Sequence, residues 1–394
     1  MKILQVLPRY APAWAYGGGV QMFWMLAREL VRRGHHLEVV TSDSRSRDAR
    51  FDRLEEELEH GIHVRRYRNR YNSMSATLPA VFYRPRSMRE GLRAAVAGVD
   101  VVHMGESRGI HNVWTADATS HAGVPLAWSA FGGLPTATGV RGLYRRAHDV
   151  LWTRRVVPRV EAFIAQTPHE RAVYVEHGAP PQKIREIPLC VDLSAFDKMP
   201  ARGAFRRGLG LPDSDQLIVC VARLAPVKGL ELLVQAHALI PANARGPHLA
   251  LVGWDHGSLE ALRSLAARLG VASRVHFPGA LFGDDRLVAY RDADVFALAP
   301  IVFEETSLAA LEAAASGCVT VLTPHCEVPG LAAAGGGVVV PRDPATLAGA
   351  VAGLLEDDDR RAAMGEKASA HVRSNFSVEH VTDLHEALFR ELAG

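Results

Sequence analysis

Short apolar segments that alternate with helix-length segments constrain the fold of this chain more than any other feature. In the first half they lie at residues 2–7, 36–41, 100–104, 126–128, 162–166 and 184–187. Strands separated in this way are typical of βαβ units, which build parallel sheets. The pattern restarts at residues 217–222, an almost continuously apolar run of the kind found in strands covered on both faces.

These two series predict two doubly wound α/β domains of similar size, residues 1–197 and 198–374, with a short linker near residues 197–204. Residues 375–394 contain an amphipathic helix whose apolar side chains are spaced three or four apart. We expect this helix to pack back on the first domain. Open α/β sheets bind ligands at the carboxyl ends of their strands, so the residues that follow the strands are the candidate site residues.

Composition excludes several classes of protein. The chain has 394 residues, of which 48% are hydrophobic and 22% charged, so it can build large cores and is not mainly disordered. No apolar run reaches the roughly 18 residues of a membrane span. Pro8 and Arg9 come too early for a signal peptide, so we expect none. The four cysteines form no CxxC pair, which argues against a disulfide framework and favours the cytoplasm.

Charge is distributed unevenly along the chain. Residues 1–200 contain 28 Lys and Arg against 20 Asp and Glu, whereas the remainder contains 17 against 23. Two arginine-rich runs, residues 65–93 and 141–159, include aromatic and aliphatic neighbours. Such surfaces suit an anionic membrane or a lipid pyrophosphate, and a solvated arginine-rich face is the alternative. No stacking motif or recognition helix indicates nucleic acid.

Two cations follow the strand at residues 217–222. Arg223 comes directly after it, and Lys228 precedes the helix expected at residues 230–239. Both therefore belong to the carboxyl edge of the second sheet, where a guanidinium and an ammonium group suit a diphosphate. The alternative is a pair of solvated loop cations.

Two glutamates flank the start of another expected helix. Glu304 and Glu312 are eight residues apart, which in a continuous helix means roughly 12 Å of rise and about 80° of rotation. That spacing excludes one small anion or one metal as a shared ligand, but it allows contact with two ends of an elongated polar ligand. Alternatively, Glu304 is an acid favoured by the helix dipole and Glu312 is a surface residue.

A glycine run, Gly17 to Gly19, follows the first strand and precedes a helix. Glycines at this place allow the backbone to approach a phosphate at a helix N-terminus. Asp43 ends the second strand, as in dinucleotide-binding domains, but the GxGxxG motif fails because its last position is Met22. A flexible loop is the alternative interpretation.

Together these segments resemble glycosyltransferase family 4, and the resemblance covers nearly the whole chain. It extends to residues 30–41, to residues 187–196 at the domain junction, to residues 221–229 and 249–257, and to the E-x7-E segment at residues 304–312. The resemblance implies a retaining, metal-independent, hexosyltransferase-like enzyme with the GT-B fold. In that fold two Rossmann-like domains face a central cleft, and a nucleotide sugar is the donor substrate.

The resemblance also implies roles for individual residues. Arg223 and Lys228 would hold the donor diphosphate and, with Glu304, would carry catalysis. Glu304 would bind hydroxyls of the donor sugar, and Glu312 would bind the ribose.

Backbone groups complete the implied donor site. Gly17 and Gly18 would contact the donor from the first domain. Amides near Ser307 and Leu308, at a helix start, would assist the phosphates. No metal and no cofactor is expected.

The chain departs from the family pattern in three places. Leu189 and Cys190 stand where the family often has Asn-Gly, and Trp254 and Asp255 occupy a turn that is usually simpler. Phe131 stands where many members have a histidine after the strand at residues 126–128. His103 and His121, its neighbours in the sequence, are expected to be structural or surface residues.

These features predict a cytoplasmic enzyme, peripheral at the inner face of the membrane, that extends a glycan or a lipid-linked acceptor in cell-surface polysaccharide synthesis. Three alternatives stay open at this point: a small soluble acceptor, a non-catalytic partner subunit that binds nucleotide sugars, and a sugar-nucleotide epimerase. The base, the sugar, the acceptor, the linkage and the oligomeric state also stay open.

Overall fold

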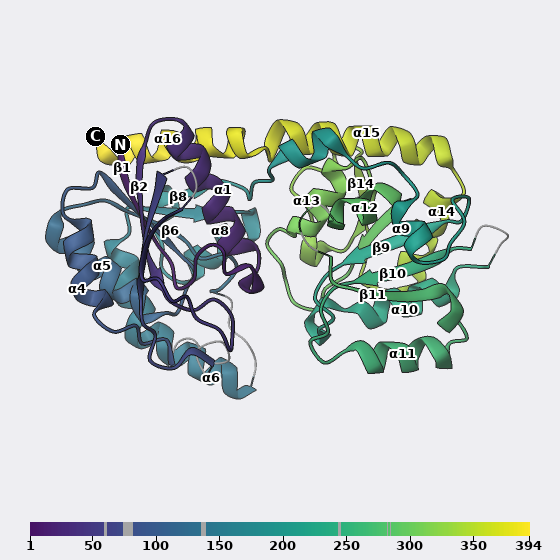
Figure 1. Ribbon diagram of the computed structural model, residues 1–394, viewed down its shortest axis with the longest axis horizontal. Helices are drawn as coiled ribbons and strands as arrows, with labels where there is room; N and C mark the ends of the chain where they lie inside the picture. The colour runs from purple at the N-terminus through teal and green to yellow at the C-terminus, as the bar shows by residue number, and fades with distance from the viewer. Residues whose placement is uncertain (59–60, 74–81, 135–138, 243–245, 282, 284) are drawn as a thin grey trace. The chain divides into compact units, whose positions relative to one another are not determined.

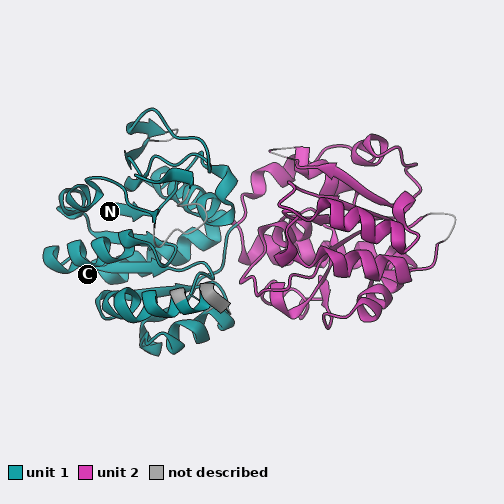
Figure 2. Cartoon of the chain, turned by 90° about the horizontal axis from the view of Figure 1, so that it is seen from below, with its two compact units in different colours: residues 1–190, 378–394 teal, residues 191–377 magenta. Residues whose placement is uncertain are grey.

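The computed structural model describes residues 1–394 except 59–60, 74–81, 135–138, 243–245, 282 and 284 (Figure 1). The chain divides into two compact units (Figure 2). Unit 1 comprises Met1–Cys190 and Val378–Gly394, and unit 2 comprises Val191–Ser377. The chain therefore passes between the units twice, near Val191 and near Ser377. Val191 N–H donates to Phe376 O at 2.8 Å, so these two segments of unit 2 lie side by side.

Unit 1 contains a sheet with strand order β3-β4-β2-β1-β5-β6-β7-β8. All neighbouring strands are parallel except β3 and β4. The strands are β1 (Lys2–Val6), β2 (His36–Ser42), β3 (Glu55–Leu58), β4 (Ile62–Tyr67), β5 (Val101–Gly105), β6 (Leu126–Ser129), β7 (Ala162–Ala165) and β8 (Ile184–Glu186).

The helices of unit 1 are α1 (Gly18–Arg32), α4 (Met88–Val96), α5 (Ile110–Ala122), α6 (Gly139–His148), α7 (Arg154–Val156), α8 (Pro168–Glu176) and α16 (Val378–Ala393). Short helical turns are η1 (Trp14–Tyr16), η3 (Asp149–Thr153), η4 (Val157–Arg159) and η5 (Pro181–Lys183). In α1, Val20, Phe23, Leu26 and Leu30 are spaced three or four apart and all are buried, which explains why this segment is an amphipathic helix.

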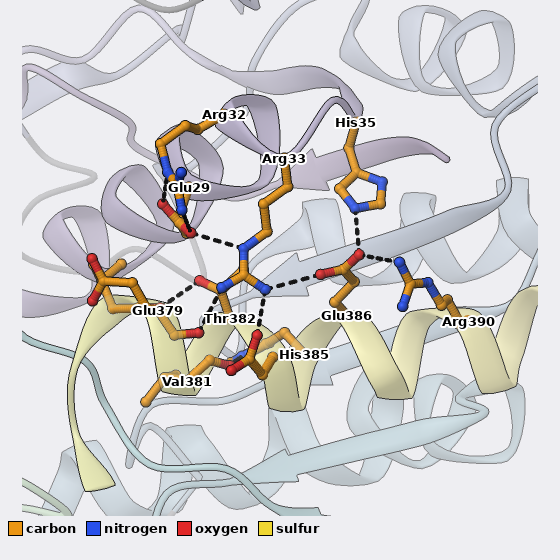
Figure 3. Close-up of polar contacts among 12 residues, drawn as sticks. Glu29, Arg32, Arg33, His35, Glu379, Val381, Thr382, His385, Glu386 and Arg390 are labelled. Carbon is orange, nitrogen blue, oxygen red and sulfur yellow. Dashed lines mark hydrogen bonds and ion pairs between the residues drawn. The ribbon is translucent and has the colours of Figure 1, made fainter. Parts of the chain in front are cut away.

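Helix α16 packs beside α1 in unit 1 (Figure 3). At the end of α1, the Arg33 guanidinium contacts Glu29 at 2.8 Å, Asp383 at 2.5 Å and Glu386 at 3.0 Å. It also donates to the backbone oxygen of Glu379 at 2.9 Å. Arg33 is therefore the centre of the polar attachment between the N-terminal helix and the C-terminal helix.

Unit 2 contains a fully parallel sheet with strand order β11-β10-β9-β12-β13-β14. In chain order this is 3-2-1-4-5-6, the order of the doubly wound dinucleotide-binding fold. The strands are β9 (Leu217–Val221), β10 (His248–Val252), β11 (Val275–Gly279), β12 (Val295–Leu298), β13 (Val319–Leu322) and β14 (Gly337–Val339).

The helices of unit 2 are α9 (Ala204–Gly208), α10 (Leu230–Leu239), α11 (Leu259–Arg268), α12 (Asp285–Asp292), α13 (Leu308–Ala315), α14 (Pro344–Leu355) and α15 (Asp358–Asn375). Short turns are η6 (Leu193–Lys198), η7 (Pro226–Lys228), η8 (Ala272–Arg274) and η9 (Pro324–Cys326). Among helices in the described part of the chain, none combines the length and apolar character needed to cross a membrane.

The observed strands coincide with the apolar segments of the sequence, except for the β3–β4 hairpin and for the short strand β14, which were not expected. In β4, Ile62, Val64 and Arg66 all point to a buried face. An arginine at the third inward position breaks the apolar alternation, so this strand was missed. Arg66 is only 3% exposed and forms an ion pair with Glu56, which makes its burial possible. Arg66 therefore does not belong to the exposed arginine-rich surface that was expected at residues 65–93.

Candidate functional site

The loops after β9, β10 and β12 meet at the carboxyl edge of the unit 2 sheet. Leu224 N–H, after β9, donates to Trp254 O, after β10, at 2.8 Å. Ile301 N–H, after β12, donates to Val227 O at 2.9 Å. These backbone bonds hold the residues that follow three neighbouring strands in one place.

Two glycines make this close approach possible. A Cβ added to Gly253 would lie 1.8 Å from Ala222 O, and one added to Gly229 would lie 2.1 Å from Ala299 O. Gly229 also has a φ of 64°, in the left-handed region that favours glycine. Any side chain at either position would push the loops apart.

Lys228 and Glu304 form an ion pair at this edge. Lys228 Nζ lies 2.5 Å from Glu304 Oε1, and the side chains are 16% and 17% exposed. Glu304 N–H donates to His325 O at 2.7 Å, which fixes its backbone beside η9. The structure thus brings together two of the site residues that the sequence analysis named separately.

Arg223 lies in the same group of loops and is exposed. No side chain in the described part of the chain forms an ion pair with its guanidinium. Nearby exposed apolar side chains are Val227, Trp254, Ile301 and Val302. An open cation beside apolar surface can bind a ligand that has both an anionic and an apolar part.

Ser307 and Leu308 form the N-terminus of α13. Ser307 is the N-cap, and its Oγ accepts the N–H of Ala310. Leu308 is the first residue of the helix. Backbone N–H groups in the first turn of a helix favour anions, so this end of α13 can bind a phosphate.

Glu312 is buried on α13 and both of its carboxylate oxygens have partners. Oε1 accepts from Arg286 at 3.0 Å, and Oε2 accepts from the Tyr290 hydroxyl at 2.9 Å. Burial and the nearby carboxylate raise the pKa of Tyr290 well above its usual range. The sequence alternative, a surface glutamate, is wrong because Glu312 is 8% exposed.

Arg286 and Tyr290 belong to no motif that indicates a site in the sequence. They are four residues apart on α12, so both lie on one face of that helix. That spacing was the available signal, but nothing in the sequence pairs α12 with α13. Asp255 has a structural role, since it accepts from the N–H groups of Gly257, Ser258 and Leu259 before α11.

In unit 1, Gly17 and Gly18 lie where a helix N-terminus faces the carboxyl edge of the sheet. Gly17 is the N-cap of α1 with a φ of 90°, and Gly18 is the first helical residue. Phe131, which follows β6, has a φ of 52° and packs against Phe23 with ring centroids 5.6 Å apart. The helix begins at Gly18, so Gly18 and Gly19 belong to α1 and do not precede it as expected.

Neither His103 nor His121 places an imidazole at the carboxyl edge of the unit 1 sheet beside Phe131. His103 is buried, stacks on Phe23 at 4.4 Å and contacts Ser129 Oγ at 2.9 Å. Burial holds the pKa of His103 well below its usual range, so the ring is neutral. His121 lies on α5 and contacts Asp117 O. Their expected structural and surface roles agree with these positions.

Glu106 is a residue of this edge that the sequence analysis did not single out. It directly follows β5, has a φ of 60° and lies 3.9 Å from Arg9. Burial raises its pKa above the usual range of a carboxyl group, while Arg9 opposes that shift. Its position one residue after a strand was the signal that could have identified it.

Two family models match the chain. The model described as Glycosyltransferase Family 4 matches residues 16–195, and the model described as Glycosyl transferases group 1 matches residues 201–371. The two matches correspond closely to units 1 and 2.

Among curated relatives, the chain is similar to the D-inositol 3-phosphate glycosyltransferases of Corynebacterium efficiens and Salinispora tropica. Identity is 30% over 275 residues and 32% over 281 residues, or 64% and 65% of this chain. The match covers 62% and 56% of the relatives' own lengths, which is less than two thirds.

Solved structures show the fold. The HepE protein of Anabaena in complex with UDP has a TM-score of 0.79 at 18% identity, covering 99% of this chain and 100% of that one. Its complex with UDP-glucose has a TM-score of 0.76 at 20% identity, covering 98% and 99%. The prediction of two Rossmann-like domains of the GT-B type is confirmed.

Proposed function

The chain belongs to glycosyltransferase family 4, and from this premise we propose that it is a retaining glycosyltransferase that uses a nucleoside-diphosphate sugar. The observation that carries the proposal is the Lys228–Glu304 pair beside Arg223 at the carboxyl edge of the unit 2 sheet. Open α/β sheets bind nucleotides at this edge. The HepE complexes with UDP and UDP-glucose, which share the fold, support a nucleotide-sugar donor.

The donor diphosphate would bind between the cations and the start of α13. Arg223 and Lys228 supply positive charge, and the first amides of α13 supply N–H donors. A diphosphate that approaches Lys228 competes with Glu304 for its ammonium group. The released Glu304 carboxylate can then accept hydrogen bonds from hydroxyls of the donor sugar.

Transfer would follow from this arrangement. As the bond between sugar and phosphate breaks, negative charge grows on the leaving diphosphate, and Arg223 and Lys228 stabilise it more than they stabilise the ground state. The acceptor hydroxyl attacks from the same face, and its proton passes to the departing phosphate oxygen. This route retains the configuration of the sugar, as the family resemblance implies.

The acceptor would bind to unit 1, and two acceptor classes have support. The names of the curated relatives favour a small phosphorylated polyol. Exposed Leu143, Val150 and Leu151 on α6 and η3, close in sequence to Arg154 and Arg155, favour a lipid-linked glycan at an anionic membrane. In the other arginine run Tyr83 is buried, and Leu78 lies outside the described residues.

A turnover assay tests the proposal against the alternative of a non-catalytic binder. The protein is incubated with UDP-, GDP- and ADP-sugars and a mixture of polyol phosphates and lipid-linked glycans, and released nucleoside diphosphate and product mass are measured. Enzyme-dependent release from one donor class is expected. Tight nucleotide binding without release or product would favour the non-catalytic binder.

A further inference from the structure

A cavity of about 570 Å³ lies in unit 1, at the side of the sheet formed by β2, β3 and β4. Six arginines line it: Arg50, Arg65, Arg66, Arg68, Arg70 and Arg86. Among the described residues that line it, Glu55 is the only acid. We call this cavity the arginine pocket.

The arginine pocket lies at the carboxyl edge of the sheet. Strands β2 and β4 are parallel and end together, with Ser42 opposite Tyr67. Arg68 and Arg70 follow β4 directly, and antiparallel β3 brings Glu55 opposite Arg65 at the same end. This is the edge at which open α/β sheets bind ligands.

Three of the six guanidinium groups each have a different acid as a partner, whereas Arg68 shares Asp43 with Arg50. Arg50 donates two hydrogen bonds to buried Asp43 at 2.8 and 2.9 Å. Arg66 pairs with Glu56, and Arg65 lies 3.8 Å from Glu38. Asp43 also accepts the N–H of Asn69 at 2.9 Å, so its oxygens bind Arg50 and the backbone after β4. They are not directed at a ribose, as they would be in a dinucleotide-binding domain.

The other three leave a surplus of positive charge. Arg68 is 57% exposed and lies 3.9 Å from the Asp43 oxygen that Arg50 already occupies. Arg70 stacks over the Tyr71 ring at 5.2 Å, and within the described residues neither Arg70 nor Arg86 has a carboxylate partner. An anion that enters the pocket would therefore meet guanidinium groups that are available for hydrogen bonding.

The backbone holds these three side chains near one another. Arg86 N–H donates to Arg68 O at 2.9 Å, and Arg70 N–H donates to Arg84 O at 3.2 Å. Asn69 Oδ1 accepts the N–H of Arg84 at 2.7 Å. The Asn69–Pro85 bridge thus holds Arg68 and Arg86 next to each other, which reduces the entropy that binding would cost.

We propose that the arginine pocket binds a phosphate or diphosphate group of the acceptor. Guanidinium groups bind phosphate oxygens in a bidentate manner, and the cavity volume lies in the range of small-molecule sites. The identification of the ligand as the acceptor rests on the proposed function. The existence of the anion site does not. A soluble sugar phosphate and a lipid-linked diphosphate carry the same group.

Titration with inorganic pyrophosphate, followed by calorimetry, tests the site in the full chain. The variant R70S/R86S removes two guanidinium groups of the pocket, and R89S/R93S removes two exposed arginines of α4 outside it. A background variant, R223A/K228A, removes the cations of unit 2. In this background we expect pyrophosphate binding to persist, to weaken at least tenfold with R70S/R86S, and to change less than twofold with R89S/R93S.

Equal weakening by the two arginine pairs would overturn the proposal, because it would show only general attraction between charges. Loss of all binding in R223A/K228A would also overturn it, because the anion would then bind only to unit 2. UDP binding, measured without that background, should be unchanged in R70S/R86S. Absence of sugar transfer with pocket binding intact would reject the proposed function and leave the anion site.

Vesicle sedimentation separates an anion site in the arginine pocket from a surface that binds an anionic membrane. Vesicles of phosphatidylcholine alone and with phosphatidylglycerol are compared for wild type, R70S/R86S and L143S/L151S. If the pocket binds a phosphate or diphosphate group and not a lipid surface, R70S/R86S should weaken pyrophosphate binding but keep any vesicle binding. L143S/L151S should reduce the vesicle binding. Loss of vesicle binding in R70S/R86S without a change in pyrophosphate affinity would overturn the pocket in favour of a membrane surface.

Discussion

At the scale of single residues, Lys228 forms a short ion pair with Glu304 and lies in the same loop as the exposed Arg223. We expect Lys228→Ala to lower the turnover number by about a hundredfold, equivalent to ~3 kcal/mol of transition-state stabilisation. Circular dichroism should show an unchanged fold. Lys198→Ala, which removes a cation of unit 2 outside the site, is the control and should retain wild-type turnover. Wild-type turnover in Lys228→Ala and in Arg223→Ala would remove both residues from the site.

The two glutamates should separate nucleotide binding from sugar transfer. Glu304→Gln removes the negative charge that competes for Lys228, so affinity for bare nucleoside diphosphate should stay equal or rise while transfer falls. Glu312→Gln retains the shape of a side chain held by Arg286 and Tyr290 but changes the proposed ribose contact, and affinity should fall roughly tenfold. Calorimetry with UDP, GDP and ADP measures both. The same loss of affinity in both variants would contradict the separate roles.

His385 links stability to pH. It is buried on α16, its ring lies 5.5 Å from that of His103 and 5.8 Å from that of Phe389, and its Nδ1–H donates to Val381 O. Burial lowers its pKa to about 4. Between that value and the unfolded value of about 6.5, only the unfolded chain binds the proton, so stability decreases as the pH falls through this window.

We therefore expect His385→Phe to reduce the loss of stability between pH 7.5 and pH 5 by about 2 kcal/mol. Urea unfolding at both pH values measures the effect. His121→Gln changes an exposed histidine of the same unit and should lose as much stability as the wild type. A His385→Phe protein with the wild-type pH dependence would show that this ring does not carry the effect.

At the scale of elements, α16 depends on Arg33 for its polar attachment to α1. Arg33→Ala removes the contacts with Glu29, Asp383 and Glu386, although Glu29 keeps Arg32 and Glu386 keeps Arg390 as partners. Because several charge-assisted hydrogen bonds between the end of α1 and α16 are lost, unit 1 should lose about 2 kcal/mol of stability. Arg32→Ala is the matched control. Its side chain is 67% exposed and bonds only to Glu29 in the described residues, and it should cost less than 1 kcal/mol.

Limited proteolysis reports on the element directly. In Arg33→Ala, cleavage near the start of α16 should become faster than in the wild type, because local opening of the helix becomes easier. Equal cleavage rates in Arg33→Ala and Arg32→Ala would show that apolar packing alone holds α16.

At the scale of the whole molecule, the two units should respond differently to a nucleotide. If the donor binds to the carboxyl edge of the unit 2 sheet, UDP or the preferred nucleotide at 100 times its dissociation constant should stabilise that unit by ~2.7 kcal/mol. Hydrogen exchange should slow in β9, η7 and α13. Equal protection of β9 and of β4 would contradict a donor site formed mainly by unit 2.

The sequence alone determined the class of fold, because strand and helix periodicity is a local property. The apolar segments 36–41, 126–128 and 217–222 coincide to within one residue with β2, β6 and β9, and the helix expected at residues 230–239 is α10. The sequence also places Arg223 and Lys228 correctly between β9 and α10, and it places Ser307 and Leu308 correctly at the start of α13. These positions depend only on where each element begins and ends.

Only the tertiary structure decided which of these residues touch. The Lys228–Glu304 pair joins residues 76 positions apart in the chain. The hydrogen bonds from Arg286 and Tyr290 to Glu312 require α12 and α13 to pack together. The same holds for Arg66, which has the sequence signature of a surface charge but is buried because Glu56 on the neighbouring strand neutralises it. Burial and pairing of charges depend on distant segments, and one chain's periodicity does not specify them.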